Sequence, residues 1–201
     1  MPTRRLILAS ASPARLSVLR AAGFDPEVVV SDVPEDGVDH LPVSDAAVAL
    51  AVCKAQAVVD RLGAVDALVV GCDSMLSIDD ARRGKPASVD QARAWLRVWR
   101  GRSGTLVTGQ CVVDTTTGRQ ATGVVETEVR YGDPSDAELE AYLATGEALQ
   151  VAGAFTLDGY SAPFVDGVTG DPGGVLGLSL PLLRQLLRKL DIAITDLWAA
   201  P

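Results

Sequence analysis

The chain has 201 residues, of which 48% are hydrophobic and 22% charged, as in a single globular domain spanning residues 1–201. Its formal charge of −8 argues against a nucleic-acid partner, and the lone histidine, His40, argues against His-based triads. No apolar stretch reaches the roughly 18 residues that span a bilayer, and the N-terminus lacks the apolar core of a secretory signal. We therefore expect a cytoplasmic protein without a membrane partner.

Three widely spaced cysteines lie in apolar surroundings: Cys53, Cys72 and Cys111. Their odd number and spacing predict reduced, buried thiols, with neither a disulfide frame nor a zinc site.

The first half of the chain reads as alternating strands and helices. In chain order we expect the strand Leu6–Ala9, a helix from Pro13 to just before Gly23, the strand Glu27–Ser31 and a polar loop, Asp32–Pro42. A long helix, Ser44–Leu62, and two strands, Ala67–Cys72 and Met75–Ile78, follow. Ser12 is suited to the N-cap position before Pro13, and Ser44 is expected to cap the long helix. A turn is expected after Cys72.

The second half mixes helices with hairpin strands. We expect the helix Asp90–Arg100, then a β-hairpin of the strands Thr105–Asp114 and Thr122–Tyr131 joined by a turn at Thr115–Gly118, and then the helix Ser135–Ala144. The irregular glycine-rich segment Gly153–Gly177, the helix Pro181–Leu190 and the tail Ile192–Pro201 follow. Ser135 and Glu138 have the spacing of a capping box. Trp95 and Trp99 are expected in the core or at an interface. Together these elements predict an α/β fold with a mixed sheet.

Hydroxyl groups and a cation follow the first predicted strand. Ser10 and Ser12 precede a helix whose N-terminal N–H groups can bind an anion, and Arg15 lies in its first turn. A cation there opposes the helix dipole, and a bound phosphate would resolve that conflict. In the alternative interpretation, Ser12 only caps the helix and Arg15 points to solvent.

Lys54 interrupts an apolar helical face. Its neighbours three and four residues away are all apolar: Leu50, Ala51, Ala57 and Val58. A lysine there must extend its ammonium to solvent, pair with an anion or reach toward a ligand.

Carboxylates and a further lysine complete the candidate set. Asp73 follows the longest buried-strand run, where it could hold a metal ion or act as a general base, or only form a turn. Lys85 lies between Gly84 and Pro86, and Glu35 lies in an acidic loop; each could also be an ordinary solvated charge. Together the cations, hydroxyls and carboxylates predict phosphate-ester chemistry.

Several segments resemble, in order, the Maf family of nucleoside triphosphate pyrophosphatases. They cover nearly the whole chain: Leu8–Arg15, Lys54–Ala57, Gly71–Ser74, Gly84–Pro86, Ala141–Glu147, Ala152–Phe155 and Val175–Leu182. The resemblance implies an elongated mixed sheet flanked by helices in two lobes with a central cleft, similar to inosine triphosphate pyrophosphatases. It also implies a cytoplasmic homodimer, for which Trp95, Trp99 and Trp198 are candidate packing residues.

The implied reaction is the metal-dependent hydrolysis of a nucleoside triphosphate to a monophosphate and pyrophosphate. The resemblance leaves open a house-cleaning role on modified nucleotides. On matching positions, Asp73 is similar to the family's catalytic acid–base residue. Glu35 is similar to its metal-associated glutamate, so Glu35 and Asp73 would hold Mg²⁺ or Mn²⁺. The phosphate-binding set would comprise Ser10, Ser12, Arg15, Lys54 and Lys85.

This chain departs from the family pattern at three places. It has Ala14-Arg15 where many members have two arginines, Val151 where a lysine is common, and Leu157-Asp158-Gly159 in place of Ile-Gln-Gly. The last two departures concern the expected base pocket, so Asp158 joins the predicted substrate-binding residues, and the chain matches neither the dTTP/UTP-preferring nor the 7-methyl-GTP-preferring members cleanly. Two other functions stay open: a phosphatase that releases inorganic phosphate, and a non-enzymatic nucleotide-binding regulator of cell division.

Overall fold

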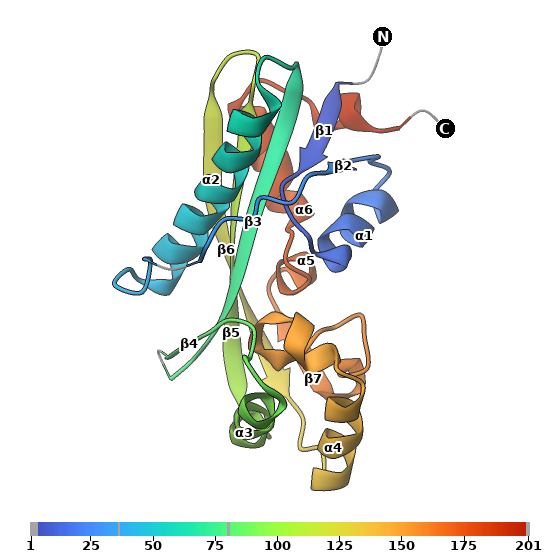
Figure 1. Ribbon diagram of the computed structural model, residues 1–201. Coiled ribbons are helices and arrows are strands. Elements are labelled where there is room, and N and C mark those ends of the chain that lie inside the picture. The colour runs from blue at the N-terminus through green and yellow to red at the C-terminus, as the bar shows by residue number, and fades with distance from the viewer. Residues whose placement is uncertain (1–3, 36, 80, 200–201) are drawn as a thin grey trace. The chain divides into compact units, whose positions relative to one another are not determined.

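The computed structural model describes residues 4–35, 37–79 and 81–199 (Figure 1). Within them the chain forms an α/β fold around a seven-stranded mixed sheet of order β2-β1-β3-β5-β6-β7, with β4 paired to β3. The strands are β1 (Arg5–Leu8), β2 (Glu27–Val28), β3 (Ala67–Ile78), β4 (Ala81–Arg83), β5 (Ser103–Asp114), β6 (Gln120–Tyr131) and β7 (Val165–Thr169). The helices are α1 (Pro13–Ala21), α2 (Val43–Leu62), α3 (Val89–Trp99), α4 (Asp136–Ala144), α5 (Pro172–Val175) and α6 (Leu180–Lys189).

The chain divides into two compact units, each described here by itself. Unit 1 contains residues 1–73, 108–125 and 177–201, and unit 2 contains residues 74–107 and 126–176. The long strands β3, β5 and β6 each contribute residues to both units. The Maf-like expectation of a single domain over residues 1–201 stays a prediction.

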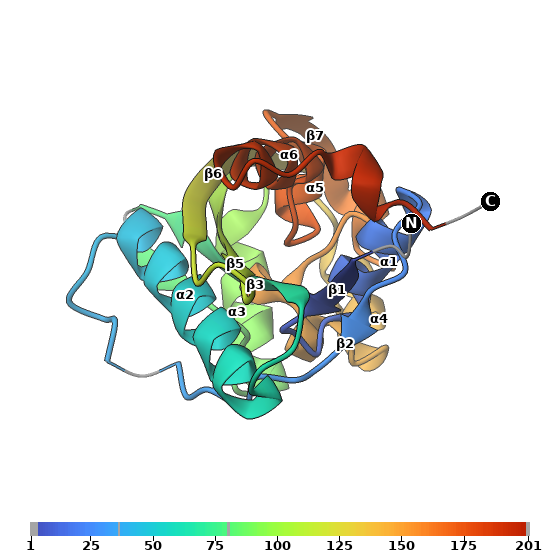
Figure 2. The ribbon, with the colours of Figure 1, turned by 90° about the horizontal axis from the view of Figure 1, so that it is seen from above.

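Unit 1 is a sheet covered on both faces. Strand β1 pairs in parallel with β2 and β3, and its residues Leu6, Ile7 and Leu8 are buried between helices. Leu6 and Leu8 pack with Leu183 of α6 on one face, whereas Ile7 packs with Ala51 of α2 on the other. Figure 2 shows α2 on one side of β1 and β3, with α1 and α6 on the other. This alternation follows from the period of two along a strand.

Unit 2 is held together by aromatic rings. Trp99 of α3 stacks on Tyr131 at a centroid distance of 5.6 Å, and Tyr131 meets Phe155 edge-on at 4.8 Å. Trp99 is buried, as expected of a core residue, whereas Trp95 is half-buried beneath the guanidinium of Arg83. The predicted homodimer, with Trp198 as a packing candidate, stays a prediction.

The predicted N-caps are present at two of the three helices. Ser12 accepts from the backbone N–H of Arg15, and Ser135 and Glu138 form a capping box, so both predictions are confirmed. Ser44 does not cap α2: the helix begins at Val43 with Pro42 at the N-cap, because the fixed φ of proline already directs the chain into the helix.

Three strand predictions need correction. The predicted turn after Cys72 is absent, because β3 continues beside the equally long β5 to Ile78. Strand β2 ends at Val28 and not at Ser31, since its partner β1 ends at Leu8. The segment predicted as irregular, residues 153–177, contains β7 and α5.

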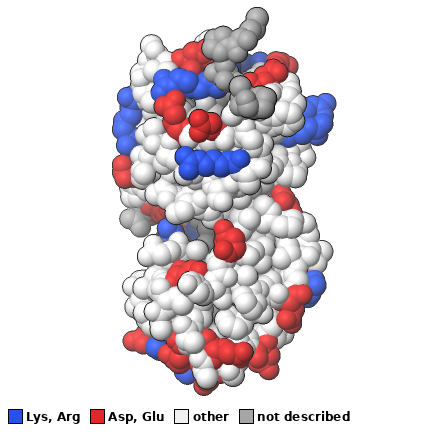
Figure 3. All heavy atoms as spheres, turned by 90° about the vertical axis from the view of Figure 1, so that its right-hand side faces the viewer, with Lys and Arg blue, Asp and Glu red and all other residues white. Residues whose placement is uncertain are grey.

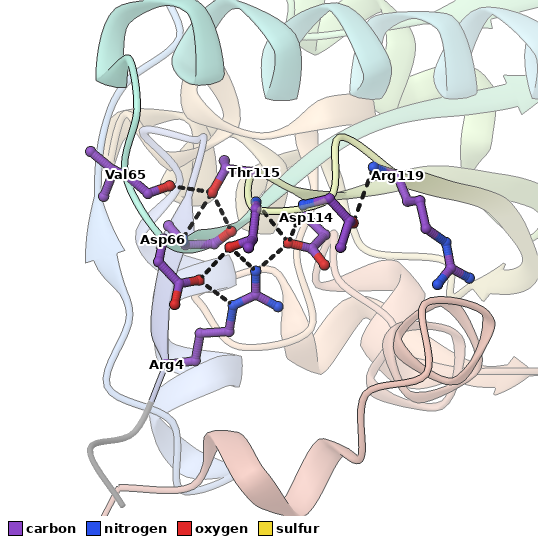
Figure 4. Close-up of polar contacts among 9 residues, drawn as sticks. Arg4, Val65, Asp66, Asp114, Thr115 and Arg119 are labelled. Atoms are coloured by element: carbon purple, nitrogen blue, oxygen red, sulfur yellow. Dashed lines mark hydrogen bonds and ion pairs between the residues drawn. The ribbon is translucent and has the colours of Figure 1, made fainter.

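A polar cluster joins three segments of unit 1 where β3 begins (Figure 4). Arg4 Nε donates to Asp66 Oδ1 at 2.7 Å, and Arg4 Nη2 donates to Asp114 and to the Thr116 hydroxyl. The Thr115 hydroxyl in turn bonds the carbonyl oxygens of Val65 and Ala67. This set, here called the Arg4 cluster, ties β1 and the α2–β3 connection to the end of β5.

The cysteines are free thiols, as predicted. Burial raises the pKa of Cys72 to about 11 and that of Cys111 to about 12, so both are unreactive near neutral pH. Cys53 lies on an exposed face of α2, so its predicted burial is wrong. The described helices include none long and apolar enough to cross a membrane.

Surface charge agrees with the acidic composition. On the face drawn in Figure 3, Lys and Arg side chains stand in small groups among acidic and uncharged residues. That distribution gives this face no broad basic surface of the kind that nucleic acids require.

Candidate functional site

Lys54 is the centre of the candidate site. It lies on the buried face of α2 with an exposed fraction of 7%, and its Nζ donates to Asp73 Oδ1 at 2.5 Å and Glu35 Oε1 at 2.7 Å. Of the possibilities open from the sequence, pairing with anions is the one the structure shows. A buried ammonium is tolerable when carboxylates pair with it.

Two glycines allow α2 to reach the sheet closely enough for this contact. A Cβ on Gly71 would lie 2.2 Å from the carbonyl oxygen of Ala51, and a Cβ on Gly109 would lie 2.3 Å from the carbonyl carbon of Ala47. Both would clash with backbone that cannot move aside cheaply. The missing side chains therefore set the spacing at which Lys54 meets Asp73.

Asp73 lies inside β3 and not in a turn after it, so the turn interpretation is wrong. The side chain is buried, with the residue 5% exposed. Burial raises the pKa of the Asp73 carboxyl, and the nearby charges of Lys54 and Arg15 oppose this rise without cancelling it. Perturbed titration of a buried carboxyl beside specific charges is typical of functional sites.

Glu35 reaches the same ammonium from a different segment. Its side chain is 65% exposed, in the loop between β2 and α2, and it is not merely a solvated charge because it bonds Lys54. Two carboxylates on one cationic nitrogen offer hard oxygen ligands of the kind that Mg²⁺ and Mn²⁺ accept. The described residues include no group of three or more His, Cys, Asp or Glu that could hold a metal ion.

The loop before α1 is organised around Arg15. Ser10 is buried, and its hydroxyl accepts from the backbone N–H of Ser12 at 3.2 Å and from Arg15 Nη1 at 3.0 Å. Arg15 also donates from Nη1 to the Cys72 carbonyl and from Nε to the Gly177 carbonyl, both at 2.9 Å. The interpretation that Arg15 points to solvent is therefore wrong. Arg15 and Lys54 approach adjacent residues of β3, Cys72 and Asp73.

Lys85 and Asp158 belong to unit 2. Lys85 is exposed in the connection between β4 and α3, next to Gly84, whose carbonyl accepts from the Gly153 N–H at 2.9 Å. Asp158 is exposed, and its carboxylate accepts from the hydroxyl of Thr156. Their predicted roles in substrate binding stay predictions. Within unit 1, Arg15 contacts Ser10, and Lys54 contacts both Asp73 and Glu35.

Sequence reasoning missed the supporting residues of the site. Gly71 and Gly109 each interrupt a strand pattern, a sign of close backbone approach that could have been used. Gln110 is a fully buried polar residue of β5, and Ser179 N donates to its Oε1 at 2.7 Å.

Comparison with known proteins decides the family. The model of the family described as Maf-like protein matches residues 5–190. The chain belongs to the Maf family. A Maf relative from Streptomyces coelicolor, named nucleoside triphosphate pyrophosphatase, is 54% identical over 98% of this chain and 96% of its own length. Relatives with the same name from Streptomyces avermitilis and Salinispora tropica are each 52% identical, over 98% and 97% of this chain and 96% and 88% of their own lengths.

Among solved structures, the chain matches a crystal structure of a nucleoside-triphosphatase / dITP/XTP pyrophosphatase from Mycobacterium abscessus. The match has 18% identity and a TM-score of 0.37 over 63% of this chain and 74% of that one. This likeness is too weak to support an argument about the Maf chain.

Proposed function

We propose that this Maf protein hydrolyses a nucleoside triphosphate to a nucleoside monophosphate and pyrophosphate. Two findings support the proposal: the shared name of relatives that are about half identical over nearly the full chain, and the contacts of the site. The observation that carries it is the Lys54 ammonium between the carboxylates of Asp73 and Glu35, one residue along β3 from the carbonyl bound by Arg15.

Positive charge and donors in unit 1 suit a polyphosphate. Arg15 and Lys54 would offset charge on the triphosphate and on the departing pyrophosphate, and the Ser10–Ser12 loop would fix its position. In phosphoryl transfer most of the catalytic effect comes from such positioning and charge stabilisation. In unit 2, Lys85 would add a further cation and Asp158 would take part in base selection.

Asp73 would accept the proton of the attacking water. Burial raises the pKa of its carboxyl, which makes the ionised form a stronger proton acceptor than an exposed aspartate. The water attacks the α-phosphorus, a P–O bond to water forms, and the bond to the pyrophosphate oxygen breaks. The electron pair of that bond leaves with pyrophosphate.

A divalent cation fits the donor set. The carboxylates of Glu35 and Asp73 converge on one nitrogen and would hold Mg²⁺ or Mn²⁺ together with substrate oxygens. When bound, the cation would neutralise charge on the phosphates. Lys54 would then give up part of its hydrogen bonding to Asp73 and Glu35 and donate to the substrate phosphates instead.

Product analysis tests the proposal directly. Purified protein is incubated with canonical and modified nucleoside triphosphates and Mg²⁺ or Mn²⁺, and pyrophosphate and inorganic phosphate are measured separately. We expect pyrophosphate and monophosphate in equal amounts, and loss of turnover with a chelator. Release of inorganic phosphate alone would instead identify a phosphatase, and tight binding without turnover would identify a regulator. A preference for modified nucleotides would support a house-cleaning role.

A further inference from the structure

Gln110 of β5 is a buried amide that the proposed mechanism does not use. It is completely buried, its Oε1 accepts from the backbone N–H of Ser179 at 2.7 Å, and its Nε2 has no partner among the described residues. Leaving a buried donor unpaired costs free energy. We attribute the presence of Gln110 at this buried position to the hydrogen bond that its Oε1 accepts from the Ser179 N–H.

The segment that Gln110 holds also binds Arg15. The Gly177 carbonyl accepts from Arg15 Nε, and two residues later the Ser179 N–H donates to Gln110. Between them Leu178 is completely buried, and Ser179 caps α6 through its hydroxyl. Gly177 has φ = 90°, a conformation that residues with a side chain rarely adopt. The direction of its carbonyl therefore depends on both ends of a short, constrained segment.

Strand register places Gln110 next to the same part of the site. The N–H of Thr115 donates to the Ala67 carbonyl at one end of the pair, and a Cβ on Gly104 would meet the Ile78 side chain at the other, so β5 runs antiparallel to its neighbour β3. Counting five residues along each strand from that contact brings Gln110 level with Cys72. The Cys72 carbonyl is another acceptor of Arg15. Gln110 thus lies beside the β3 residue whose carbonyl Arg15 binds, and Gln110 and Arg15 hold the two ends of one segment.

We propose that Gln110 is a positioning residue for Arg15. By fixing the Ser179 amide it fixes the Gly177 carbonyl, which together with the Cys72 carbonyl and the Ser10 hydroxyl orients the guanidinium. The inference rests on the proposed function in one respect, that Arg15 binds a phosphate group. Displacement of a binding group by about 1 Å can cost as much as 10²-fold in rate.

A double-mutant cycle tests this coupling. Gln110→Met keeps the volume and removes the acceptor, Arg15→Met removes the guanidinium, and the double variant combines them. We expect Gln110→Met to weaken binding of pyrophosphate, measured by calorimetry, about tenfold, and to lower kcat/KM about 10- to 100-fold. In the Arg15→Met background the same change should alter either quantity less than about threefold, because there is no guanidinium left to position.

Control variants separate positioning from a general loss of packing. Thr115→Val removes hydrogen bonds at the far end of β5 and should leave pyrophosphate affinity within about twofold of wild type. Ser179→Ala removes the α6 cap but keeps the N–H that Gln110 binds, so it should lower Tm with little change in affinity. Equal effects of Gln110→Met in both backgrounds would overturn the proposal.

A second variant covers failure of Gln110→Met to fold, which circular dichroism would reveal. Gln110→Glu retains an oxygen that can accept from Ser179 and should keep Gly177 in place, so pyrophosphate affinity should stay within about threefold of wild type. A loss of tenfold or more in a folded Gln110→Glu protein would contradict the proposal. If wild type releases phosphate instead of pyrophosphate, the proposed function fails while the binding cycle still reports on Gln110. If wild type does not bind pyrophosphate, the positioning proposal fails as well.

Discussion

Two clusters in unit 1 have the same ingredients and opposite electrostatics. In each, one cation lies between two carboxylates: Arg4 between Asp66 and Asp114, and Lys54 between Glu35 and Asp73. Asp114 and Asp73 are almost equally buried, at 4% and 5% exposed. Nevertheless the pKa of Asp114 is lowered to about 2, whereas that of Asp73 is raised.

The difference comes from the number of donors that meet each carboxylate and from depth, because Asp73 lies deeper among protein atoms than Asp114. Burial alone would raise the pKa of Asp114, but hydrogen bonds from Arg4, Thr117 and Thr116 outweigh it. At Asp73 burial outweighs the contribution of Lys54. A carboxylate whose hydrogen-bond donors outweigh burial stays ionised and contributes to stability. A carboxylate for which burial outweighs the donors binds a proton or a metal ion more readily.

The largest expected contrast is in turnover. Asp73→Asn removes the proposed base and should lower kcat by roughly 10²- to 10³-fold, the effect of losing one well-placed electrostatic group. Asp114→Asn, a matched change at an equally buried aspartate, should stay within about threefold of wild type. Steady-state assays of pyrophosphate release measure both, and similar rates for the two variants would remove the functional distinction between the clusters.

Removal of the cation should shift the pH dependence of catalysis. In Lys54→Met only the charge of Arg15 still opposes the effect of burial, so the pKa of Asp73 rises further. The base is active when deprotonated, so activity should fall about 10²-fold near neutral pH and recover in part as pH increases. A pH–rate profile checks the direction: an acidic limb unmoved or shifted to lower pH would contradict it.

Stability should rank the same two aspartates in the opposite order. Asp114→Asn removes an ionised group whose pKa is lowered in the folded state, which corresponds to about 1 to 2 kcal/mol of stability once screening by solvent is included. Asp73→Asn removes a charge that burial disfavours but leaves the Lys54 ammonium paired with Glu35 alone, so its free energy of unfolding should fall by less than that of Asp114→Asn. Urea titration at neutral pH gives both values, and a larger loss for Asp73→Asn would reverse our interpretation of the pKa shifts.

Acid should weaken the Arg4 cluster selectively. Because the folded-state pKa of Asp114 lies below its unfolded value, its contribution is complete above about pH 4 and disappears as pH falls toward 2. Arg4→Met should reduce this pH dependence by removing the main hydrogen-bond donor. Measurements of Tm between pH 5 and pH 2 report this loss of stability. If Tm fell equally steeply with pH in wild type and Arg4→Met, the Arg4–Asp114 pair would not be the cause.

The smallest effect is expected at the exposed edge of the Arg4 cluster. The Thr116 hydroxyl accepts from Arg4 Nη2 at 2.8 Å and donates to Asp66 at 2.7 Å. Thr116→Val loses both bonds in solvent and should cost less than about 1 kcal/mol. Urea titration beside Asp114→Asn measures the difference, and a cost above 2 kcal/mol would place the strength of the cluster in its exposed part.

The regular elements of the fold were predictable because local patterns determine them. The caps at Ser12 and Ser135 follow from side chains that bond the first helical turn, whatever lies further away. The continuity of β3 through Asp73 was not predictable, since it depends on pairing with β5, which lies some 30 residues later. Propensity near Asp73 favours a turn, and strand pairing overrides it.

The candidate site was predictable in its charged members and in Ser10 and Ser12, but not in the contacts that join them. Lys54 stood out because its helical neighbours are apolar, and Asp73 because it follows a buried run. The pairing of Lys54 with both carboxylates depends on how α2 lies over the sheet, and the Gly177 carbonyl bound by Arg15 is 162 residues away from it. No local pattern encodes contacts over such separations.

The bare backbone at Gly71 and Gly109 turns the ammonium–carboxylate separation into an adjustable quantity. One methyl group at either position would lift α2 off the strands while every titratable side chain kept its identity. Alanine variants at these two positions would therefore have the same net charge as the wild type but a larger distance between Lys54 and Asp73. Their turnover rates would show how the catalytic effect of the ammonium depends on that distance.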